Sequence, residues 1–343
     1  MSIPVINIQP LCHQQSQSSK VEIKRAVVEI GKACQSPGFF YISGWESLVS
    51  KDNMVRLERL SHTFFQREHD EKMSISMKRS GLHWKGYFPS GDELTSGAPD
   101  AKEGLYFGEE YALDSPQVLK RLAMHGPNQF PKEDEILWRD TVTQYMNELT
   151  TLGLCVMKGI ALSLGLPSNY FEVEFCHPKP FTPFRIFKYP GGDSRQGVGR
   201  HTDYGCLTIL KQDDVGGLEV ESSDGTWIPA PPIPDTFVVN IGDMLEIWTG
   251  GRYRATPHRV VTNLPRPRMS MPFFFDPAFN AVIDSKSMRS GSLVLRNAAG
   301  EEDVVVIDQT IKYGEYITHK VAHVFPELFS TSGGQDRLSS SKL

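Results

Sequence analysis

The sequence predicts an α+β protein whose second half is an antiparallel β-sandwich or jelly roll. After position 180, short β-rich runs follow one another, and each is bounded by Gly, Pro, Asp or Asn without an intervening helix. Before that position, segments with helical periodicity alternate with a short strand and loops. The sequence shows neither an internal repeat nor a parallel strand–helix–strand alternation, which argues against a dinucleotide-binding fold.

The first part is expected to contain two helices with a strand between them. Apolar residues recur at helical spacing over residues 21–34, and Ser18 or Ser19 is available as the N-cap. Residues 39–44 are typical of a strand, and residues 53–65 form the second helix. Residues 79–108 are rich in Gly, Pro, Ser and aromatics, which predicts a long, packed, functional loop.

A long helix is expected over residues 133–164, where apolar side chains recur at three- and four-residue steps until Pro167 ends the pattern. A final helix over residues 310–324 closes the ordered part. One integrated structural unit is expected, with an N-terminal α/β region, a helical support, the jelly-roll core with its closing helix, and a flexible tail. These segments cover residues 1–125, 126–180, 181–325 and 326–343.

The composition argues against several kinds of partner. The net charge of −5 is spread without long runs of like charge, whereas nucleic acid or an anionic membrane usually requires a basic patch. No stretch approaches the roughly 18 apolar residues of a membrane span, and the N-terminus lacks the features of a signal peptide. Five cysteines without a CxxC pair indicate free thiols in a reducing compartment. We also expect the protein to be a monomer.

The sequence closes on Ser341-Lys342-Leu343, a tripeptide that the peroxisomal import receptor reads. It follows a run rich in Ser and Gly, a composition typical of a protruding tail. We therefore expect the import receptor as a partner and the peroxisome as the location, with the cytoplasm as the alternative.

Three residues in two β-rich runs form a candidate metal site. His201 and Asp203 stand two apart at the start of one run, and side chains two apart on a strand point to the same face. His258 begins another run further along, at a distance that suits a return to the same sheet. Two imidazoles and one carboxylate on one face leave the opposite coordination positions open, as non-haem Fe(II) requires. A closed structural zinc site would need a fourth ligand, usually with thiolates.

Arg268 and Ser270 form a candidate anion site in the next β-rich run. They are two apart and should share a face, where a guanidinium can bind a carboxylate bidentately and a hydroxyl can donate one more hydrogen bond. Such a pair would suit the distal carboxylate of a dicarboxylic keto acid whose other end binds iron.

The sequence resembles the isopenicillin N synthase-like 2-oxoglutarate-dependent oxygenases over nearly its whole length, from about residue 3 to residue 325. The resemblance is carried by HTDYGCLTILKQDDVGGLEV, NIGDMLEIWTGGRYRATPHRV and RMSMPFFFDP, and near the N-terminus by IPVINI, ACQSPGFFYISG and FFQREHDEK. It implies a double-stranded β-helix core with an N-terminal α/β portion, flanking helices, and iron at one mouth of the barrel.

The resemblance also implies cofactors and their ligands. His201, Asp203 and His258 match the ligands of Fe(II), and the co-substrates are 2-oxoglutarate and O₂, with ascorbate as a reductant. The reaction releases succinate and CO₂ while a small-molecule substrate is hydroxylated, desaturated or closed into a ring.

The co-substrate site is implied in the same way. Arg268 and Ser270 match the pair that binds the distal carboxylate of 2-oxoglutarate, and Tyr189 matches a tyrosine that often hydrogen-bonds the same group. Phe187 departs from the asparagine that many plant members carry near the co-substrate.

Aromatic side chains near these motifs are candidates for the substrate pocket, namely Tyr204, Phe187, Tyr87 and Phe274. Two other readings stay open. One is a catalytically silent jelly-roll protein that binds metal or a small molecule, and the other is an oxidase of the same family that does not use 2-oxoglutarate.

Overall fold

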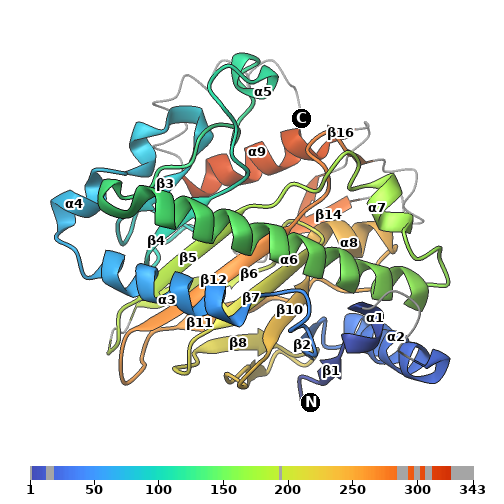
Figure 1. The fold of residues 1–343 in the computed structure, drawn as a ribbon. Coiled ribbons are helices and arrows are strands. Elements are labelled where there is room, and N and C mark those ends of the chain that lie inside the picture. The colour runs from blue at the N-terminus through green and yellow to red at the C-terminus, as the bar shows by residue number, and fades with distance from the viewer. Residues whose placement is uncertain are drawn as a thin grey trace.

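Two β-sheets form the centre of the molecule (Figure 1). A cavity between them is lined by residues of both sheets. The computed structural model describes residues 2–12, 19–192, 195–283, 293–296, 302–305 and 311–325. The larger sheet has eight strands in the order β1-β2-β10-β7-β12-β5-β4-β3, and the smaller has four in the order β6-β11-β8-β9. Two further pairs, β13-β16 and β14-β15, lie in the last quarter of the chain.

The larger sheet joins both halves of the sequence. Antiparallel pairing links β2 to β10 and β4 to β5, so the N-terminal strands extend the same sheet as the later ones. Its strands are β1 Val5–Asn7, β2 Phe39–Ser43, β3 Gly86–Phe88, β4 Glu103–Phe107, β5 Phe184–Tyr189, β7 Leu207–Gln212, β10 Phe237–Ile241 and β12 Arg268–Phe275.

The smaller sheet faces the larger one across the cavity. Its strands are β6 Gln196–His201, β8 Leu218–Glu221, β9 Trp227–Pro229 and β11 His258–Val261. The two remaining pairs consist of β13 Val282–Ile283, β14 Leu293–Arg296, β15 Glu302–Val305 and β16 Ile311–Lys312.

A long helix, α6, lies across the outer face of the larger sheet, with α3 beside it (Figure 1). Its buried face contacts β12 and β7, and α2 packs against its C-terminal part, where Gly159 lies beside Ile30. The helices are α1 Gln9–Cys12, α2 Lys20–Gln35, α3 Lys51–Phe65, α4 His69–Met73, α5 Pro116–Leu119, α6 Glu135–Ser163, α7 Tyr170–Glu174, α8 Asp243–Trp248 and α9 Tyr313–Val324, with 3₁₀ turns at Met77–Arg79, Gly81–His83 and Lys132–Asp134. Among the described residues, no helix has the length and apolarity that crossing a membrane would take.

Most predicted elements are confirmed. The helices α2, α3 and α6 and the strand β2 lie where the sequence places them, and Ser19 caps α2 through a capping box with Glu22. The final helix begins at Tyr313 because the two residues before it form β16. The predicted tail, residues 326–343, lies outside the described residues.

The predicted loop over residues 79–108 is wrong in part. It contains β3 and β4, which pair with each other and continue the larger sheet through β5. These strands are short and contain Gly86 and Gly104, so their local pattern lacks the β-branched alternation of a strand. Pairing with distant residues stabilises them instead.

Gly153 allows α6 to lie directly against β12. A Cβ atom added there would overlap Cδ2 of Phe275, a fully buried ring at the end of β12. The close approach matters for the site because β12 also carries Arg268 and Ser270.

We expect Gly153→Ala to lower the free energy of unfolding. At an open helical position this change stabilises by about 1 kcal/mol. Here the clash with Phe275 should cost about 2–3 kcal/mol, the upper part of the usual range for overpacking, and leave a net loss of roughly 1–2 kcal/mol. Urea denaturation would measure the change, with Thr151→Ala at an exposed position of α6 as the matched control. An unchanged or raised free energy of unfolding would contradict the close packing.

Candidate active site

The cavity between the sheets is lined by alternate residues of the facing strands. Side chains alternate between the two faces of a strand, so every second residue points inward. The inward-pointing residues include Arg185, Phe187 and Tyr189 on β5, Arg268, Ser270, Pro272 and Phe274 on β12, and His258 and Val260 on β11. The cavity has a volume of about 120 Å³.

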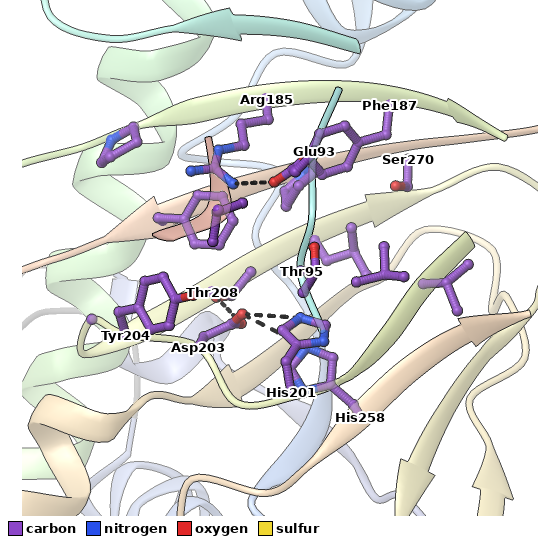
Figure 2. Close-up of a pocket in the computed structure, with 18 of the residues that line it drawn as sticks. Glu93, Thr95, Arg185, Phe187, His201, Asp203, Tyr204, Thr208, His258 and Ser270 are labelled. Carbon is purple, nitrogen blue, oxygen red and sulfur yellow. Dashed lines mark hydrogen bonds and ion pairs between the residues drawn. The ribbon is translucent and has the colours of Figure 1, made fainter. Parts of the chain in front are cut away.

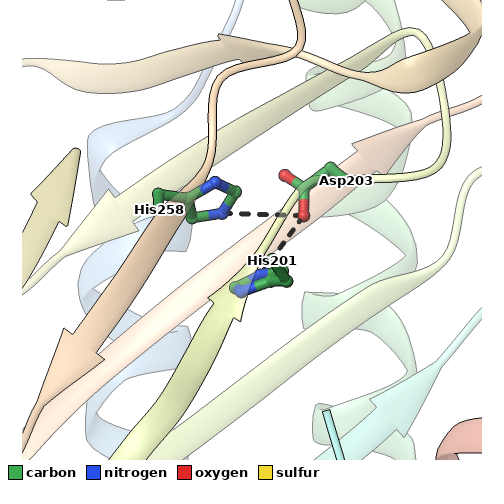
Figure 3. Close-up of side chains that lie close together, drawn as sticks. All are labelled: His201, Asp203 and His258. Atoms are coloured by element: carbon green, nitrogen blue, oxygen red, sulfur yellow. Dashed lines mark ion pairs between the residues drawn. The ribbon is translucent and has the colours of Figure 1, made fainter. Parts of the chain in front are cut away.

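Strand register brings the two predicted histidines together. His258, the first residue of β11, pairs with His201, the last residue of β6, and their ring centroids are 4.2 Å apart. Asp203 joins them, with its Oδ1 3.7 Å from Nε2 of each histidine (Figure 3). The three atoms that could bind a metal ion, one from each residue, lie within 4.8 Å of one another.

The strand argument for Asp203 is wrong, although the residue lies at the site. β6 ends at His201, and Asp203 belongs to the connection that leads into β7. Its carbonyl accepts a hydrogen bond from the amide of Asp243 at 2.7 Å, which fixes the connection. The carboxylate therefore reaches the histidines from a turn, and shared strand facing does not explain its position.

Hydrogen bonds fix the orientation of the two histidine rings. Nδ1 of His201 lies 2.8 Å from the carbonyl of Gly199, and Nδ1 of His258 lies 3.1 Å from that of Thr256. A carbonyl only accepts, so each Nδ1 carries the proton and each Nε2 offers its lone pair to the centre.

The carboxylate of Asp203 is held from the larger sheet. Its Oδ2 accepts hydrogen bonds from the hydroxyl of Thr208 and from Nδ2 of Asn240, the latter at 2.7 Å. Oδ1 is thereby left to face the two imidazoles. Neither Thr208 nor Asn240 was predicted, although Asn240 is a lone amide in the apolar run of β10 and such a buried group needs a partner.

The protonation states suit a divalent cation. Burial, together with the neighbouring His258, lowers the pKa of His201 to about 3, which keeps its ring neutral. Burial alone would raise the pKa of Asp203, but His258, His201, Asn240 and Thr208 bring it below its usual value. Two imidazoles that turn Nε2 to the centre and one ionised carboxylate, with an open face, fit Fe(II) of the non-haem oxygenase type.

Arg268 is a buried cation with free donors. Its side chain is 1% exposed, and Nη2 donates to Oε1 of Gln212 at 2.9 Å. Among the described residues, Nε and Nη1 have no hydrogen-bond partner. The guanidinium lies 5.0 Å from the ring of Tyr189, which pairs with Arg268 across the strands, and Ser270 follows on the same face. These donors fit a carboxylate such as that of 2-oxoglutarate, because a buried guanidinium needs an anion.

Three of the four predicted substrate-pocket aromatics line the cavity, namely Phe187, Tyr204 and Phe274. Tyr87 does not, which corrects the prediction. Its ring packs edge-on against Phe64 at 5.7 Å, and its hydroxyl donates to Glu103 at 2.8 Å, outside the cavity. Tyr87 is 2% exposed, so it belongs to the core around β3.

Several charged and polar lining residues were missed by the sequence analysis. Glu93, Thr95 and Lys102 line the cavity from the segment expected to contribute aromatics, and Arg185 lines it from β5. Figure 2 shows Glu93, Thr95 and Arg185 there. Arg185 could have been predicted, because it stands two residues before Phe187 on β5 and therefore points to the same face. No local pattern marks Glu93 or Lys102, since charged residues in a loop are usually exposed.

The geometry agrees with comparisons to known proteins. Residues 170–277 match the family model described as the 2OG-Fe(II) oxygenase superfamily, and residues 3–133 match that of the N-terminal region of "non-haem dioxygenase in morphine synthesis". A probable iron/ascorbate oxidoreductase of Dictyostelium discoideum is 40% identical over 365 residues, covering 95% of each chain. A homoarginine-6-hydroxylase of Arabidopsis thaliana is 31% identical over 336 residues, covering 96% of this chain and 91% of that one.

Solved structures show the same fold. A full-length Neurospora crassa protein in complex with alpha-KG and thymine superimposes with a TM-score of 0.73 at 26% identity, covering 93% of this chain and 96% of that one. A 2OG-Fe(II) oxygenase family protein of Caulobacter crescentus gives a TM-score of 0.74 at 26% identity, covering 94% and 99%. The predicted jelly-roll core with flanking helices is thus confirmed, and the chain belongs to the 2OG-Fe(II) oxygenase superfamily.

Proposed function

We propose that His201, Asp203 and His258 hold the iron of this Fe(II)- and 2-oxoglutarate-dependent oxygenase. The observation that carries the proposal is the convergence of two Nε2 atoms and one carboxylate oxygen within 4.8 Å. Each of these groups has its other polar atom occupied by a hydrogen bond, so the remaining atom is free for a metal.

Arg268, Ser270 and Tyr189 bind the distal carboxylate of 2-oxoglutarate in this proposal. The two free donors of the buried Arg268 guanidinium support that role, and they favour the use of 2-oxoglutarate over an oxidase that does without it. A silent protein that binds only a metal would leave this buried cation without an anion, which is costly.

The reaction proposed is hydroxylation of a small molecule. When bound, Fe(II) and 2-oxoglutarate activate O₂ for the oxidation of a C–H bond, and succinate and CO₂ are released. Hydroxylation is favoured over desaturation or ring closure because the plant relatives at 31–36% identity are named homoarginine-6-hydroxylases. The residues of this chain orient the substrate and exclude water. Ile317, Val321, Val324 and Phe325 form an apolar wall from α9 and its end.

The wild-type protein is expected to convert 2-oxoglutarate to succinate when Fe(II), O₂ and ascorbate are supplied, and faster with a substrate of the right class. Asp203→Ala should lose iron binding and succinate formation, because a buried ligand to the metal is removed. Iron content after anaerobic loading and succinate yield are the two measurements. His323→Ala is the control, since His323 is an exposed histidine on α9 whose loss should change neither.

The alternatives give different outcomes. Iron that binds Asp203→Ala as tightly as the wild type would refute the proposed triad. Metal binding without turnover on any substrate supports the silent protein, and oxygen uptake that ignores added 2-oxoglutarate supports the oxidase.

Arg268→Ala is expected to raise the Kd for 2-oxoglutarate by roughly 10- to 100-fold, because hydrogen bonds to a charged group contribute about 1.5–3 kcal/mol. Iron binding should be unchanged. Arg268→Lys should fall between, since it keeps the charge and loses the planar fork. Calorimetric titration of the anaerobic Fe(II) protein would measure the Kd, and an unchanged value for Arg268→Ala would place the co-substrate elsewhere.

We also propose import into peroxisomes through Ser341-Lys342-Leu343. The match of this tripeptide to the receptor's signal supports the proposal. Removal of Leu343 should move a protein with a fluorescent N-terminal fusion from peroxisomes to the cytoplasm under the microscope. A diffuse signal with the complete tripeptide would refute it and favour the cytoplasm.

A further inference from the structure

Arg185 presents a second guanidinium to the cavity, apart from Arg268. It lies on β5, its side chain is 19% exposed, and it points into the space opposite the iron ligands (Figure 2). Its Cζ lies over two rings, 4.1 Å from the centroid of Tyr106 and 4.8 Å from that of Phe274. Such contacts use the face of a guanidinium and leave the edge that carries the N–H groups to a ligand.

The hydrogen-bonding capacity of Arg185 is largely unused. Among the described residues, its ion-pair contact is with Glu93, whose Oε1 lies 3.6 Å from Nη1, beyond hydrogen-bond distance. Its Nε is buried and has no partner within the same part of the chain. A guanidinium placed in a cavity without strong bonds to the protein remains able to bind an anion.

The charged side chains near Arg185 form ion pairs with one another. Lys102 lies 2.9 Å from Glu93 and 2.6 Å from Asp100, and Tyr106 donates to Glu93 at 2.7 Å. Burial alone would lower the pKa of Lys102, but Glu93 and Asp100 raise it, so the ammonium keeps its charge. The contacts of Glu93 with Lys102 and Tyr106 are therefore shorter than its contact with Arg185.

Arg185 and the proposed co-substrate site lie at different ends of β5. Tyr189 pairs with Arg268, whereas Phe184, next to Arg185, pairs with Phe273. Four residues along a strand span roughly 13 Å at ~3.3 Å per residue. Arg185 and Ser270 accordingly lie toward opposite sides of the cavity in Figure 2. One small diacid at Arg268 would leave Arg185 free for another ligand.

We propose that Arg185 binds a carboxylate of the substrate and so selects a small molecule that carries this group. This inference rests on the proposed function and names the substrate class of the same site. The carboxylate accepts two hydrogen bonds from the exposed edge of the guanidinium, while Tyr106 and Phe274 hold its plane fixed. The rest of the substrate lies between Arg185 and the iron ligands, against the apolar side chains from α9.

Paired probes test the charge requirement directly. A panel of small monocarboxylates that includes L-homoarginine is titrated into the anaerobic Fe(II)- and 2-oxoglutarate-loaded protein, each alongside its carboxamide. Calorimetry gives the Kd of each member. We expect the wild type to bind at least one carboxylate roughly 10- to 100-fold more tightly than its amide, the range for a charge-assisted bidentate pair.

Variants of Arg185 test whether this residue causes the preference for carboxylate over amide. Arg185→Gln should reduce it to about threefold or less, and Arg185→Lys should retain part of it. Arg139→Gln is the matched control, because Arg139 also stacks on an aromatic ring, at 4.9 Å from Phe130, and lies on α6 outside the cavity. It should keep the wild-type preference. Unfolding curves compare the stability of the variants, and Arg185→Lys serves if Arg185→Gln does not fold.

Three outcomes would overturn the proposal. The wild type could prefer no carboxylate over its amide, the preference could survive in Arg185→Gln, or Arg185→Gln could weaken 2-oxoglutarate binding as strongly as Arg268→Ala. Titration of 2-oxoglutarate separates this inference from the proposed function. Failure of the wild type to bind 2-oxoglutarate counts against the function, whereas normal binding without a carboxylate preference counts against Arg185 alone.

Discussion

A single buried carboxylate, that of Asp203, ties the two sheets together at the site. Thr208 and Asn240 hold one of its oxygens from the larger sheet, and the other faces two histidines from the smaller sheet. An ionised carboxylate inside a protein is stable only when hydrogen bonds and opposite charge replace water. The spacing of the sheets is thereby coupled to the charge at the centre, and a bound cation would strengthen that coupling.

The cavity divides into regions of different character because of strand alternation and strand order. The inward face of β5 carries Arg185, Phe187 and Tyr189 in turn, whereas that of β12 is polar at the end of Arg268 and Ser270 and apolar at the end of Phe274. The two imidazoles of the candidate metal site come from where β6 and β11 meet. Lys102 lies 4.8 Å from the ring of Phe187, so the position that departs from the usual asparagine has a cation against its face. The nonpolar ring of Phe187 is thus stabilised by the neighbouring charge of Lys102.

The sequence sufficed for features that depend on short-range periodicity and motif order. Arg268 and Ser270 share a face of β12, as alternation along a strand predicts, and His201 and His258 lie on paired strands, as their order and spacing predict. Asp203 was placed correctly for a reason that the structure contradicts, since it reaches the site from a turn.

Other features depend on pairing between distant segments and could not be predicted locally. Tyr87 faces the core because of the register of β3 against β4, which nothing in three residues specifies. Glu93 and Lys102 are buried only because each compensates the other's charge, and composition would place both on the surface.

The cavity wall is assembled from separate stretches of the chain. Every proposed ligand of iron and 2-oxoglutarate lies between positions 189 and 270, whereas Glu93, Thr95 and Lys102 come from the first third and the apolar wall comes from α9. Mutations in the outer stretches can therefore reshape what the cavity accepts while the oxidative machinery is inherited intact. Duplicated copies of such a gene can therefore change their substrate while the same reaction type is kept.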